Sequence, residues 1–358
     1  MVTGERGVEK AVVDAYTVRR RLGFFALVVL LCLVLAIVIL LSLVTGAVRV
    51  SPAMIFNALC NHRPLTATQE IILLQIRLPR VLAAAIVGSA LSISGLMFQG
   101  LFRNPMADPY VIGSSGGAVL GASIGIFFFS QISVFGFSAI AMMAFAGSVM
   151  TMALVYSLAR SNGKTNVITL LLAGFAVSTI LGYSGYFFGL LDNSNGNGNL
   201  ILLSWLRGII GIPHWSQLSV TAALLLLASV IAMPLMRQLN TLALGDEYAQ
   251  QLGLRVEYTR VGIILTASLL TAAAVSLGGL ISFAGLIVPH VARLLLGPDH
   301  VRLLPVSALA GAIFLVLADT LARSLFAPTE IPVGILMALL GGPFFLYLLR
   351  KTKRSYAL

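Results

Sequence analysis

Charged residues are scarce in this sequence of 358 residues, and cysteine is scarcer still. Asp, Glu, Lys and Arg make up 10% of the chain, whereas typical soluble domains carry about 25%. The two cysteines are Cys32, inside the first apolar run, and Cys60, in the loop after it, so we expect no structural disulfide. Cys60 and the nearby His62 supply only two ligands, which is too few to indicate a zinc site. The low charge argues against a soluble globular domain.

Motifs that carry enzymatic chemistry are missing as well. The sequence contains no HExxH zinc helix, no GxSxG nucleophile elbow and no pair of catalytic carboxylates. Gly163-Lys164-Thr165 matches the end of a phosphate-binding loop, but Leu158 occupies the position of the required first glycine. We therefore predict that the chain is not an enzyme and that it binds no metal, cofactor or nucleotide itself.

Long apolar runs dominate the sequence, with 59% hydrophobic residues and a mean hydropathy of +1.00. In hydrocarbon an unsatisfied backbone polar group costs several kcal/mol, so only helices and closed barrels span a membrane, and these runs lack the alternation of barrel strands. The fold class is therefore an all-α integral membrane protein. A helix needs roughly 20 apolar residues to cross the bilayer core. Ten spans are predicted, at 22–44, 79–101, 108–129, 136–158, 166–190, 216–236, 257–280, 282–297, 303–324 and 332–350. Pro289, inside the short eighth span, predicts a kink or a late start.

The net charge of +11 arises from basic residues that lie between the apolar runs, which indicates membrane topology and not a nucleic-acid surface. Arg19-Arg20-Arg21 precedes an apolar run that is too long for a cleavable signal, so we expect a retained helix. Both termini are then cytoplasmic, as basic tails at 1–21 and 351–358. The basic residues expected on or beside the cytoplasmic side are Arg6, Lys10, Arg19, Arg20, Arg21, Arg103, Arg160, Lys164, Arg237, Arg255, Arg260, Arg302, Arg350, Lys351, Lys353 and Arg354. Four notable exceptions are Arg49, Arg77, Arg80 and Arg323.

Ionisable residues inside the spans are few, although they normally mark proton relays and ion sites. Asp319 and Arg323 lie four residues apart in the ninth span and are expected to pair on one helix face. A carrier driven by protons or sodium ions usually needs a buried carboxylate near the midplane, so we expect any energy for transport to come from elsewhere. An ion-coupled secondary transporter of a small solute remains the alternative.

Small residues are dense in three segments, GSALSISG (88–95), GSSGGAVLGASIG (113–125) and SLGGLISFAG (276–285). Gly, Ala and Ser allow helix backbones to approach closely in lipid, where no hydrophobic effect drives helices together. These segments therefore predict tight packing of the bundle, and a substrate path lined by small residues is the second interpretation.

One polar segment, residues 241–254, interrupts the apolar runs. Asp246 and Glu247 fit the N-terminus of a helix and Gly253 fits the position just after its C-terminus, so a helix of about two turns is predicted. Leu244, Tyr248 and Leu252, with Ala249 beside them, form an apolar stripe. Such a helix suits the groove of a cytoplasmic partner, or it is an ordinary solvated loop helix.

Several long segments, spread from Arg77 to Leu349, resemble the FecCD type of ABC permease, the family that imports vitamin B12, iron-siderophores and haem. These segments are RLPRVLAAAIVGSALSISGLMFQGLFRNPMADPYVIG, LLLAG at 170–174, LALGDEYAQQLGL, GLISFAGLIVPHVARLLLGPDH and IPVGILMALLGGPFFLYLL. The resemblance implies a type II ABC importer permease bundle over residues 22–350, in the cell inner membrane. It also implies a second permease subunit (a homodimer or a paralogue), two cytoplasmic ATPase subunits that hold ATP and Mg, and a periplasmic or lipid-anchored substrate-binding protein.

The resemblance also implies roles for particular residues. The ATPase-coupling residues would be Leu244, Gly245, Asp246, Glu247, Ala249, Leu252 and Gly253, with Asp246 where the family often has Glu. Arg77, Arg80 and Arg323 resemble basic residues that meet acidic side chains of the binding protein, or they snorkel to lipid headgroups. The gate residues would be Asn104, Pro105, Met106, Asn166 and Val167, of which the last two depart from the family's small hydroxyl residues. The expected cargo is a metal chelate, with an iron-siderophore favoured over haem and cobalamin.

Overall fold

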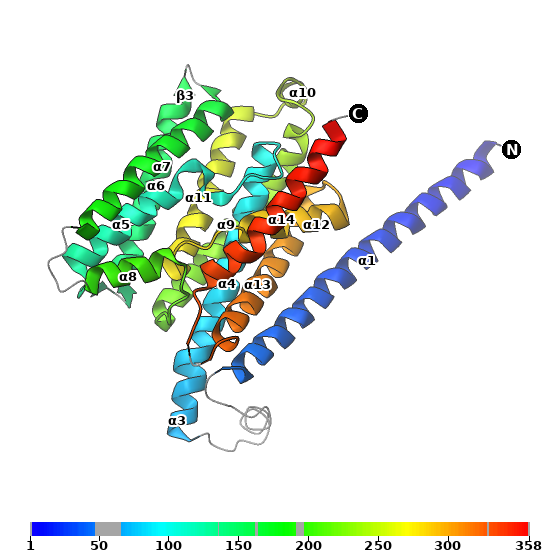
Figure 1. Cartoon of the computed structure of the whole chain (residues 1–358). Coiled ribbons are helices and arrows are strands. Elements are labelled where there is room, and N and C mark those ends of the chain that lie inside the picture. The colour runs from blue at the N-terminus through cyan, green and yellow to red at the C-terminus, as the bar shows by residue number, and fades with distance from the viewer. Residues whose placement is uncertain are drawn as a thin grey trace.

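The computed structural model is a bundle of helices and describes residues 2–46, 66–134, 136–161, 164–190, 197–327 and 329–356 (Figure 1). In chain order the elements are α1 (Val2–Val44), α3 (Ala67–Glu70), the π-helix η1 (Ile71–Arg77), α4 (Leu78–Leu101), the 3-10 helix η2 (Pro109–Ile112), α5 (Ser114–Phe129), β1 (Ser133–Val134), β2 (Phe137–Ser138), α6 (Ala139–Ala159), β3 (Arg160–Ser161), β4 (Lys164–Thr165), α7 (Val167–Leu190), α8 (Asn197–Leu206), α9 (Trp215–Leu242), α10 (Asp246–Gln251), α11 (Val256–Gly278), α12 (Ala284–Leu296), α13 (His300–Ser324) and α14 (Val333–Tyr356). Cys60, His62 and Arg49 lie outside the described residues.

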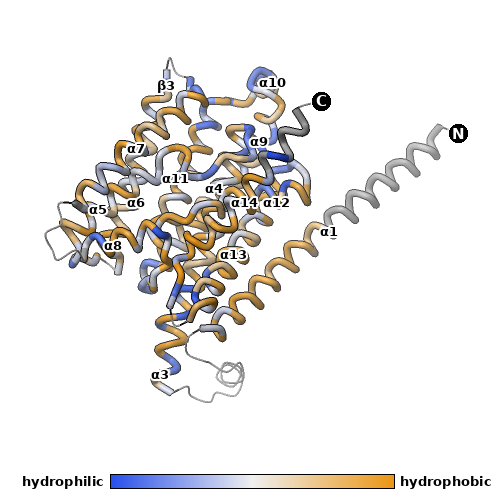
Figure 2. The backbone as a smooth tube through the Cα atoms, viewed as in Figure 1, coloured by the Kyte–Doolittle hydropathy of each residue, from blue (hydrophilic) through white to orange (hydrophobic). Residues whose placement is uncertain are grey.

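Each of the ten predicted spans corresponds to an apolar helix. Among the described residues, seven helices are long and apolar enough to cross a membrane, and Ser114–Phe129, Ala284–Leu296 and Val333–Tyr347 are shorter apolar helices. The hydrophobic colouring follows the helix shafts, while hydrophilic residues collect at α10 and around α3 (Figure 2). We use these two elements to name the ends of the bundle, the α10 end and the α3 end. The C-terminus and the β3–β4 hairpin lie at the α10 end (Figure 1).

The second span begins earlier than the sequence predicted. Its helix runs from Ala67 to Leu101, 35 residues in all, and not from residue 79. The added turns begin at a capping box between Thr66 and Gln69 and pass through the π-helix η1. Pro79 explains the wide turn, because its ring clashes with the carbonyl group four residues earlier and an i to i−5 pattern gives it room. The sequence prediction began the span at this proline and missed the helix before it.

The eighth span shows the late start that Pro289 suggested. A non-helical stretch separates α11 from α12, and Gly279 (φ +65°) and Phe283 (φ +68°) in it have left-handed backbones. The Tyr110 hydroxyl donates to the Ile281 carbonyl (3.3 Å) and accepts from the Ile281 amide (3.2 Å). The Ile281 backbone groups, which lack helical hydrogen bonds at this break, are therefore satisfied by a side chain, as a low-dielectric interior requires.

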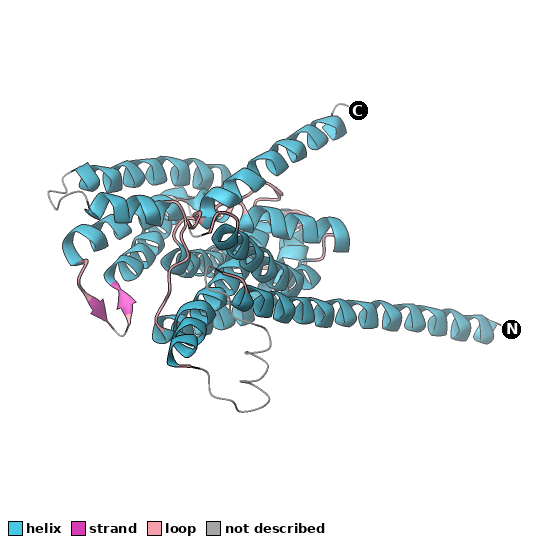
Figure 3. Cartoon of the chain, turned by 60° about the horizontal axis from the view of Figure 1, so that its bottom comes forward, coloured by secondary structure: helices cyan, strands magenta, loops and turns pink. Residues whose placement is uncertain are grey.

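Two further kinds of element were missed by the sequence prediction. The helix α8 occupies part of the expected loop after the fifth span, and two short antiparallel hairpins, β1–β2 and β3–β4, join neighbouring spans. The helix α1 packs on α13 near the α3 end and diverges from the bundle toward its N-terminus (Figures 1 and 3). Its residues Leu22–Val44 are mostly exposed, as expected of a helix surrounded by lipid.

The helix α4 lies at the centre of the bundle, against α9, α11, α12 and α13. Glycines set two of these contacts: a Cβ on Gly95 would lie 1.7 Å from the Gly285 carbonyl oxygen, and one on Gly88 would lie 2.1 Å from that of Gly311. Ser94 adds a hydrogen bond of 2.7 Å to Thr271 on α11. The predicted tight packing of small residues is confirmed.

We predict that Gly95→Ala lowers the melting temperature of the purified chain, because the new methyl group must displace the backbone of α12. Overpacking of this kind typically costs about 1–3 kcal/mol. The matched control is Gly23→Ala, since a Cβ on Gly23 meets no atom within 4 Å. Thermal unfolding in detergent measures both variants. Equal melting temperatures would show that α4 and α12 do not meet at these glycines.

Candidate functional site

The short helix α10 forms between the long helices α9 and α11, as predicted. Its first turn carries Asp246 and Glu247, and Gly253 follows it with φ +83°. The acids lie at the positive end of the helix dipole, and glycine takes the left-handed position after the last turn without strain. The sequence prediction of this element is confirmed.

The apolar stripe of this segment faces away from the protein. The side chains of Leu244, Tyr248 and Leu252 are 64%, 65% and 69% exposed, whereas Ala249 is fully buried. One small residue of the segment is therefore buried against the bundle, and three large residues are exposed. Large apolar side chains gathered on an exposed surface indicate a site of protein or membrane contact.

Asp246 connects this segment to two others. One carboxylate oxygen accepts a hydrogen bond from the Arg103 guanidinium (2.8 Å), and the other accepts one from Arg260. Arg103 also donates to the carbonyl of Leu242 (2.6 Å), the last residue of α9. Arg103 therefore contacts both sides of the turn that leads from α9 into α10.

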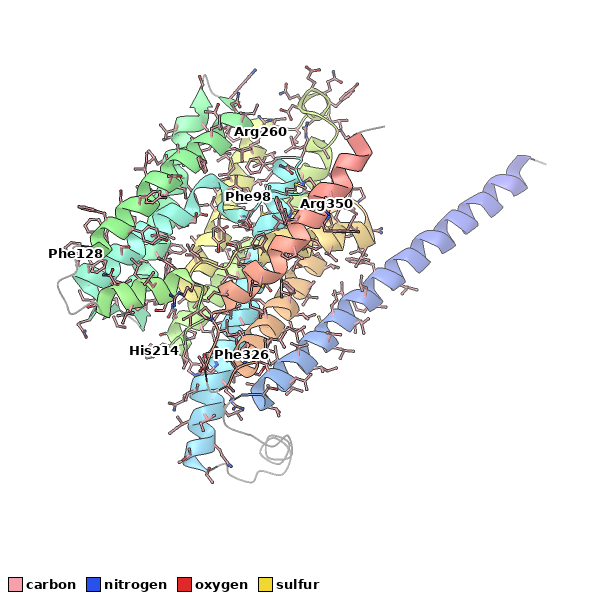
Figure 4. All side chains as sticks on the ribbon, in the orientation of Figure 1. Phe98, Phe128, His214, Arg260, Phe326 and Arg350 are labelled. Atoms are coloured by element: carbon pink, nitrogen blue, oxygen red, sulfur yellow. The ribbon has the colours of Figure 1, made fainter. Side chains whose placement is uncertain are left out.

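Arg260, in the second turn of α11, extends this connection to the β3–β4 hairpin. Its guanidinium donates to the Thr165 carbonyl (3.3 Å). Glu257, one turn earlier, accepts from the Thr165 amide (3.2 Å) and from the Thr165 hydroxyl. Arg260 lies at the α10 end (Figure 4). We call these residues the Asp246 bridge, which consists of Arg103, Thr165, Asp246, Glu257 and Arg260.

The two segments predicted as gates each begin directly after a residue of the Asp246 bridge. Asn104 follows Arg103, and its side chain accepts from the Met106 amide (2.9 Å) across Pro105. Asn166 follows Thr165, and its side chain accepts from the amides of Ile168 (2.9 Å) and Thr169 (3.2 Å), which caps the start of α7, whose first residue is Val167. Both asparagines thus shape the start of a segment. Their role as gates stays a prediction.

Three arginines predicted to present their charge to a binding protein lie at the α3 end, but they are buried. The residues Arg77, Arg80 and Arg323 are 5%, 9% and 7% exposed. The exposure on which the docking prediction depended is therefore absent from this structure, and the docking role itself stays a prediction. The three arginines are buried because this chain supplies hydrogen-bonding partners for their guanidinium groups.

Asp319 is the centre of those partners. It is fully buried and pairs with Arg80 (3.1 Å) and Arg323 (2.9 Å), which confirms the predicted pair on one face of α13. Arg80 also pairs with Glu330 (2.8 Å), a side chain that is 51% exposed. Arg77 donates to the carbonyls of Leu43 (2.5 Å) and Val44 (3.2 Å), where the last turn of α1 carries partial negative charge. We call this group the Asp319 cluster, made of Arg77, Arg80, Asp319, Arg323 and Glu330.

Neither connected group was predicted from the sequence, apart from the pair on α13. Arg103 and Arg260 were recognised only as basic residues of the cytoplasmic side, and Glu257 was not singled out. Residues 103, 165, 246 and 260 lie in four separate segments of the chain, so no periodicity in the sequence relates them. One feature of the sequence could have pointed to Arg103 and Thr165: each precedes an asparagine at a helix boundary.

Comparison with known proteins places these features in a family. The model of the FecCD transport family matches residues 34–351. The cobalamin import system permease protein BtuC of Halobacterium salinarum is 45% identical over 79% of this chain and 74% of its own length. The hemin transport system permease protein HmuU of Yersinia pestis is 40% identical over 94% of this chain and 97% of its own length. The chain belongs to the FecCD transport family.

A solved structure supports the same assignment. It is described as an inward-facing conformation of a metal-chelate type ABC transporter, and it is 31% identical, with a TM-score of 0.79, over 91% of this chain and 99% of its own. The chain is thus a multi-span membrane permease of the type II ABC importers, a class that imports metal chelates, siderophores, haem or vitamin B12. Such a permease is not itself catalytic.

We predict that Asp319→Asn destabilises the protein, because it leaves two buried guanidinium groups without their shared counter-charge. Removing one partner of a buried ion pair typically costs about 3–5 kcal/mol. Glu330→Gln is the control, and it should cost only about 0–1 kcal/mol because Glu330 is half exposed. Thermal or denaturant unfolding in detergent checks the difference, and equal losses in the two variants would contradict it.

Proposed function

We propose that this chain is the membrane subunit of a binding-protein-dependent ABC importer, and that it takes a metal chelate into the cytoplasm with ATP hydrolysed by separate subunits. A substrate-binding protein delivers the cargo on the far side of the membrane. The cargo enters a path between two permease subunits, and movement of the ATPases at the coupling residues changes which side the path faces. ATP favours one conformation of the permease because it binds a different protein that contacts it.

The observation that carries this proposal is the exposed apolar stripe of Leu244, Tyr248 and Leu252 beside the acidic start of α10. In a loop helix that contacts only water, three large apolar side chains that are more than half exposed would be unfavourable. A partner that presents a cleft would bury them, in the manner of a helix lying in a groove. The names of the relatives, which are permeases of import systems, support an ATPase as that partner.

The ion-coupled secondary transporter is the alternative, and the Asp319 cluster argues against it. A proton- or sodium-coupled carrier uses a membrane carboxylate that gains and loses its partner during transport. Asp319, which is fully buried in α13, is held by two arginines at once. Protonating it would remove the buried counter-charge that both guanidinium groups share, so this residue is poorly suited to a proton cycle.

A second permease subunit, either a second copy or a paralogue, forms the other half of the path. The helix α7 supports this proposal, because only 11% of the 18-residue apolar stretch with which it could cross the membrane is buried within one chain. The side chains of Phe175, Ile180 and Tyr183 on this helix are 73%, 65% and 72% exposed. Their large apolar area suits burial against another helix bundle or contact with lipid.

The membrane is the cell inner membrane, and both termini are cytoplasmic. The distribution of basic residues supports this orientation, since lysine and arginine resist translocation. Both termini also lie at the end of the molecule that carries α10 (Figure 1). The proposed ATPase site and the basic tails are then on the same side.

Transport in proteoliposomes tests the function. The permease, its cognate ATPase and its binding protein are reconstituted together, and uptake of labelled chelate is measured with ATP or with an ion gradient. We predict uptake only with ATP, the ATPase and the binding protein all present. Uptake that follows a proton or sodium gradient without the ATPase would overturn the proposal and favour the secondary transporter.

The cargo is tested in the same system with a ferric siderophore, haem and cobalamin. We propose an iron-siderophore, although the relatives named above carry cobalamin and hemin in their names. The ligand-loaded binding protein should stimulate ATP hydrolysis and uptake for one cargo class only. Stimulation by haem or cobalamin but not by the siderophore would replace our assignment of the cargo and leave the importer class intact.

We predict that Leu252→Asp abolishes association with the ATPase while the permease stays folded. The new carboxylate would have to be desolvated on binding, at a cost of several kcal/mol. Phe326→Asp is the matched control, because Phe326 is 66% exposed and lies at the opposite end (Figure 4). Co-purification with the ATPase measures the effect. Normal association of the Leu252 variant would exclude this stripe as the ATPase contact.

A further inference from the structure

The Asp246 bridge joins three parts of the chain that the proposed function requires to move together. The coupling segment contributes Asp246, the end of α4 contributes Arg103, and the start of α11 contributes Arg260. Through Arg260 the connection continues to Thr165 in the β3–β4 hairpin. One carboxylate therefore lies between the proposed ATPase contact and both segments predicted as gates.

The two arms of this bridge are separate. In the first, Arg103 holds Asp246 and the carbonyl of Leu242 with the same nitrogen, so a shift of α10 pulls directly on the residue before Asn104. In the second, Arg260 holds Asp246 with one terminal nitrogen and the Thr165 carbonyl with the other, directly before Asn166. Each arm ends one residue from a different predicted gate segment.

The backbone of Arg103 gives an independent indication that its side chain is required. Asn104 donates to the Gln99 carbonyl (3.1 Å) and Arg103 donates to that of Gly100 (3.2 Å), the bonding pattern of a Schellman motif at the end of α4. The position after the helix in this motif normally holds glycine, because the backbone is left-handed. Arg103 occupies it with φ +49°. A residue that is unfavourable for the backbone persists here together with two side-chain hydrogen bonds that glycine could not make.

We infer that Asp246 is a positioning residue that couples the movement of α10 to both gate segments, through Arg103 on one side and Arg260 on the other. This inference rests on the proposed function and deepens it. The exposed stripe holds the ATPase, and the Asp246 carboxylate, on the opposite side of the same short helix, passes the displacement on. The adjacent acid Glu247 has no ion pair among those found in the described residues and is exposed, so the two acids have different roles.

The first experiment measures coupling in the reconstituted complex as chelate taken up per ATP hydrolysed. Asp246→Asn should lower this ratio by roughly tenfold or more, while co-purification with the ATPase stays normal. Asp246→Glu keeps the charge and should restore the ratio. Arg302→Gln is the control, because it breaks a partly exposed pair with Asp299 (3.4 Å), and no hydrogen bond or ion pair found in the described residues joins this pair directly to α10. A wild-type ratio in Asp246→Asn would overturn the inference.

The second experiment separates coupling from simple stabilisation. Arg103→Gly removes one arm and gives the left-handed position its preferred residue, so the melting temperature should stay the same or rise while the uptake ratio falls. A fall in both quantities would show that Arg103 only stabilises the fold and would contradict the inference. A ratio equal to that of the wild type would also contradict it.

The third experiment follows each arm. A single cysteine is introduced as Met106→Cys or Val167→Cys, in a chain whose two native cysteines are removed by Cys32→Ser and Cys60→Ser. The rate of its reaction with an impermeant maleimide is measured with and without an ATP analogue trapped in the ATPase subunits. Nucleotide should change the rate at both positions in the otherwise native complex. Arg103→Gly should abolish the change only at position 106, Arg260→Gln only at position 167, and Asp246→Asn at both. Loss of the response at both positions in either arginine variant would overturn the two-arm arrangement.

These outcomes are distinct from failure of the proposed function. A wild-type complex that takes up chelate without ATP, or that never takes it up, contradicts the importer assignment whatever the variants do. Variants that behave as the wild type does in an ATP-driven importer contradict only the role of Asp246.

Discussion

The structure depends on close contact between helix backbones at glycine. Lipid offers no hydrophobic effect to drive helices together, so the bundle is held by van der Waals contact and by hydrogen bonds between spans. The contacts of Gly88 and Gly95 with Gly311 and Gly285 let α4 lie at the centre of its neighbours with no side chain between the backbones. Because α4 is continuous from the α3 end to Leu101, its position fixes Arg80 at one end and Arg103 at the other. Both charged groups are therefore placed by packing in the apolar middle.

The sequence predicted the helices well and their ends less well. Apolar length is a property of consecutive residues, so ten spans and the short helix α10 could be found from composition and periodicity. The added turns at Ala67–Arg77 were missed because Pro79 was taken as a boundary, whereas a π-helical turn carries the helix past it. The helix α8 and both hairpins lie in polar connections, where local patterns are weak.

The candidate site was predicted only where its residues are neighbours in the sequence. The exposed stripe on α10 and the Asp319–Arg323 pair follow from helical spacing, and both were foreseen. The contacts of Asp246 with Arg103 and Arg260 depend on how α4, α9 and α11 end relative to one another. The burial of Arg77 and Arg80 depends likewise on α1 and α13. A count of basic residues per side predicts on which side of the membrane they lie, but it cannot predict their partners.

The two charged groups differ in a way that matches the work proposed for each end. In the Asp319 cluster the shared carboxylate is fully buried, so breaking one pair would leave uncompensated charge in a low dielectric, and this end is expected to move as a unit. In the Asp246 bridge the Arg103 arm is the more exposed one, since the side chains of Arg103 and Asp246 are 48% and 39% exposed and that of Arg260 is 17% exposed. Ion pairs of that kind contribute only about 0–1 kcal/mol, because water replaces either partner readily. The Arg103–Asp246 pair therefore transmits a displacement while it is formed, and it can be broken and remade in each transport cycle without a large barrier.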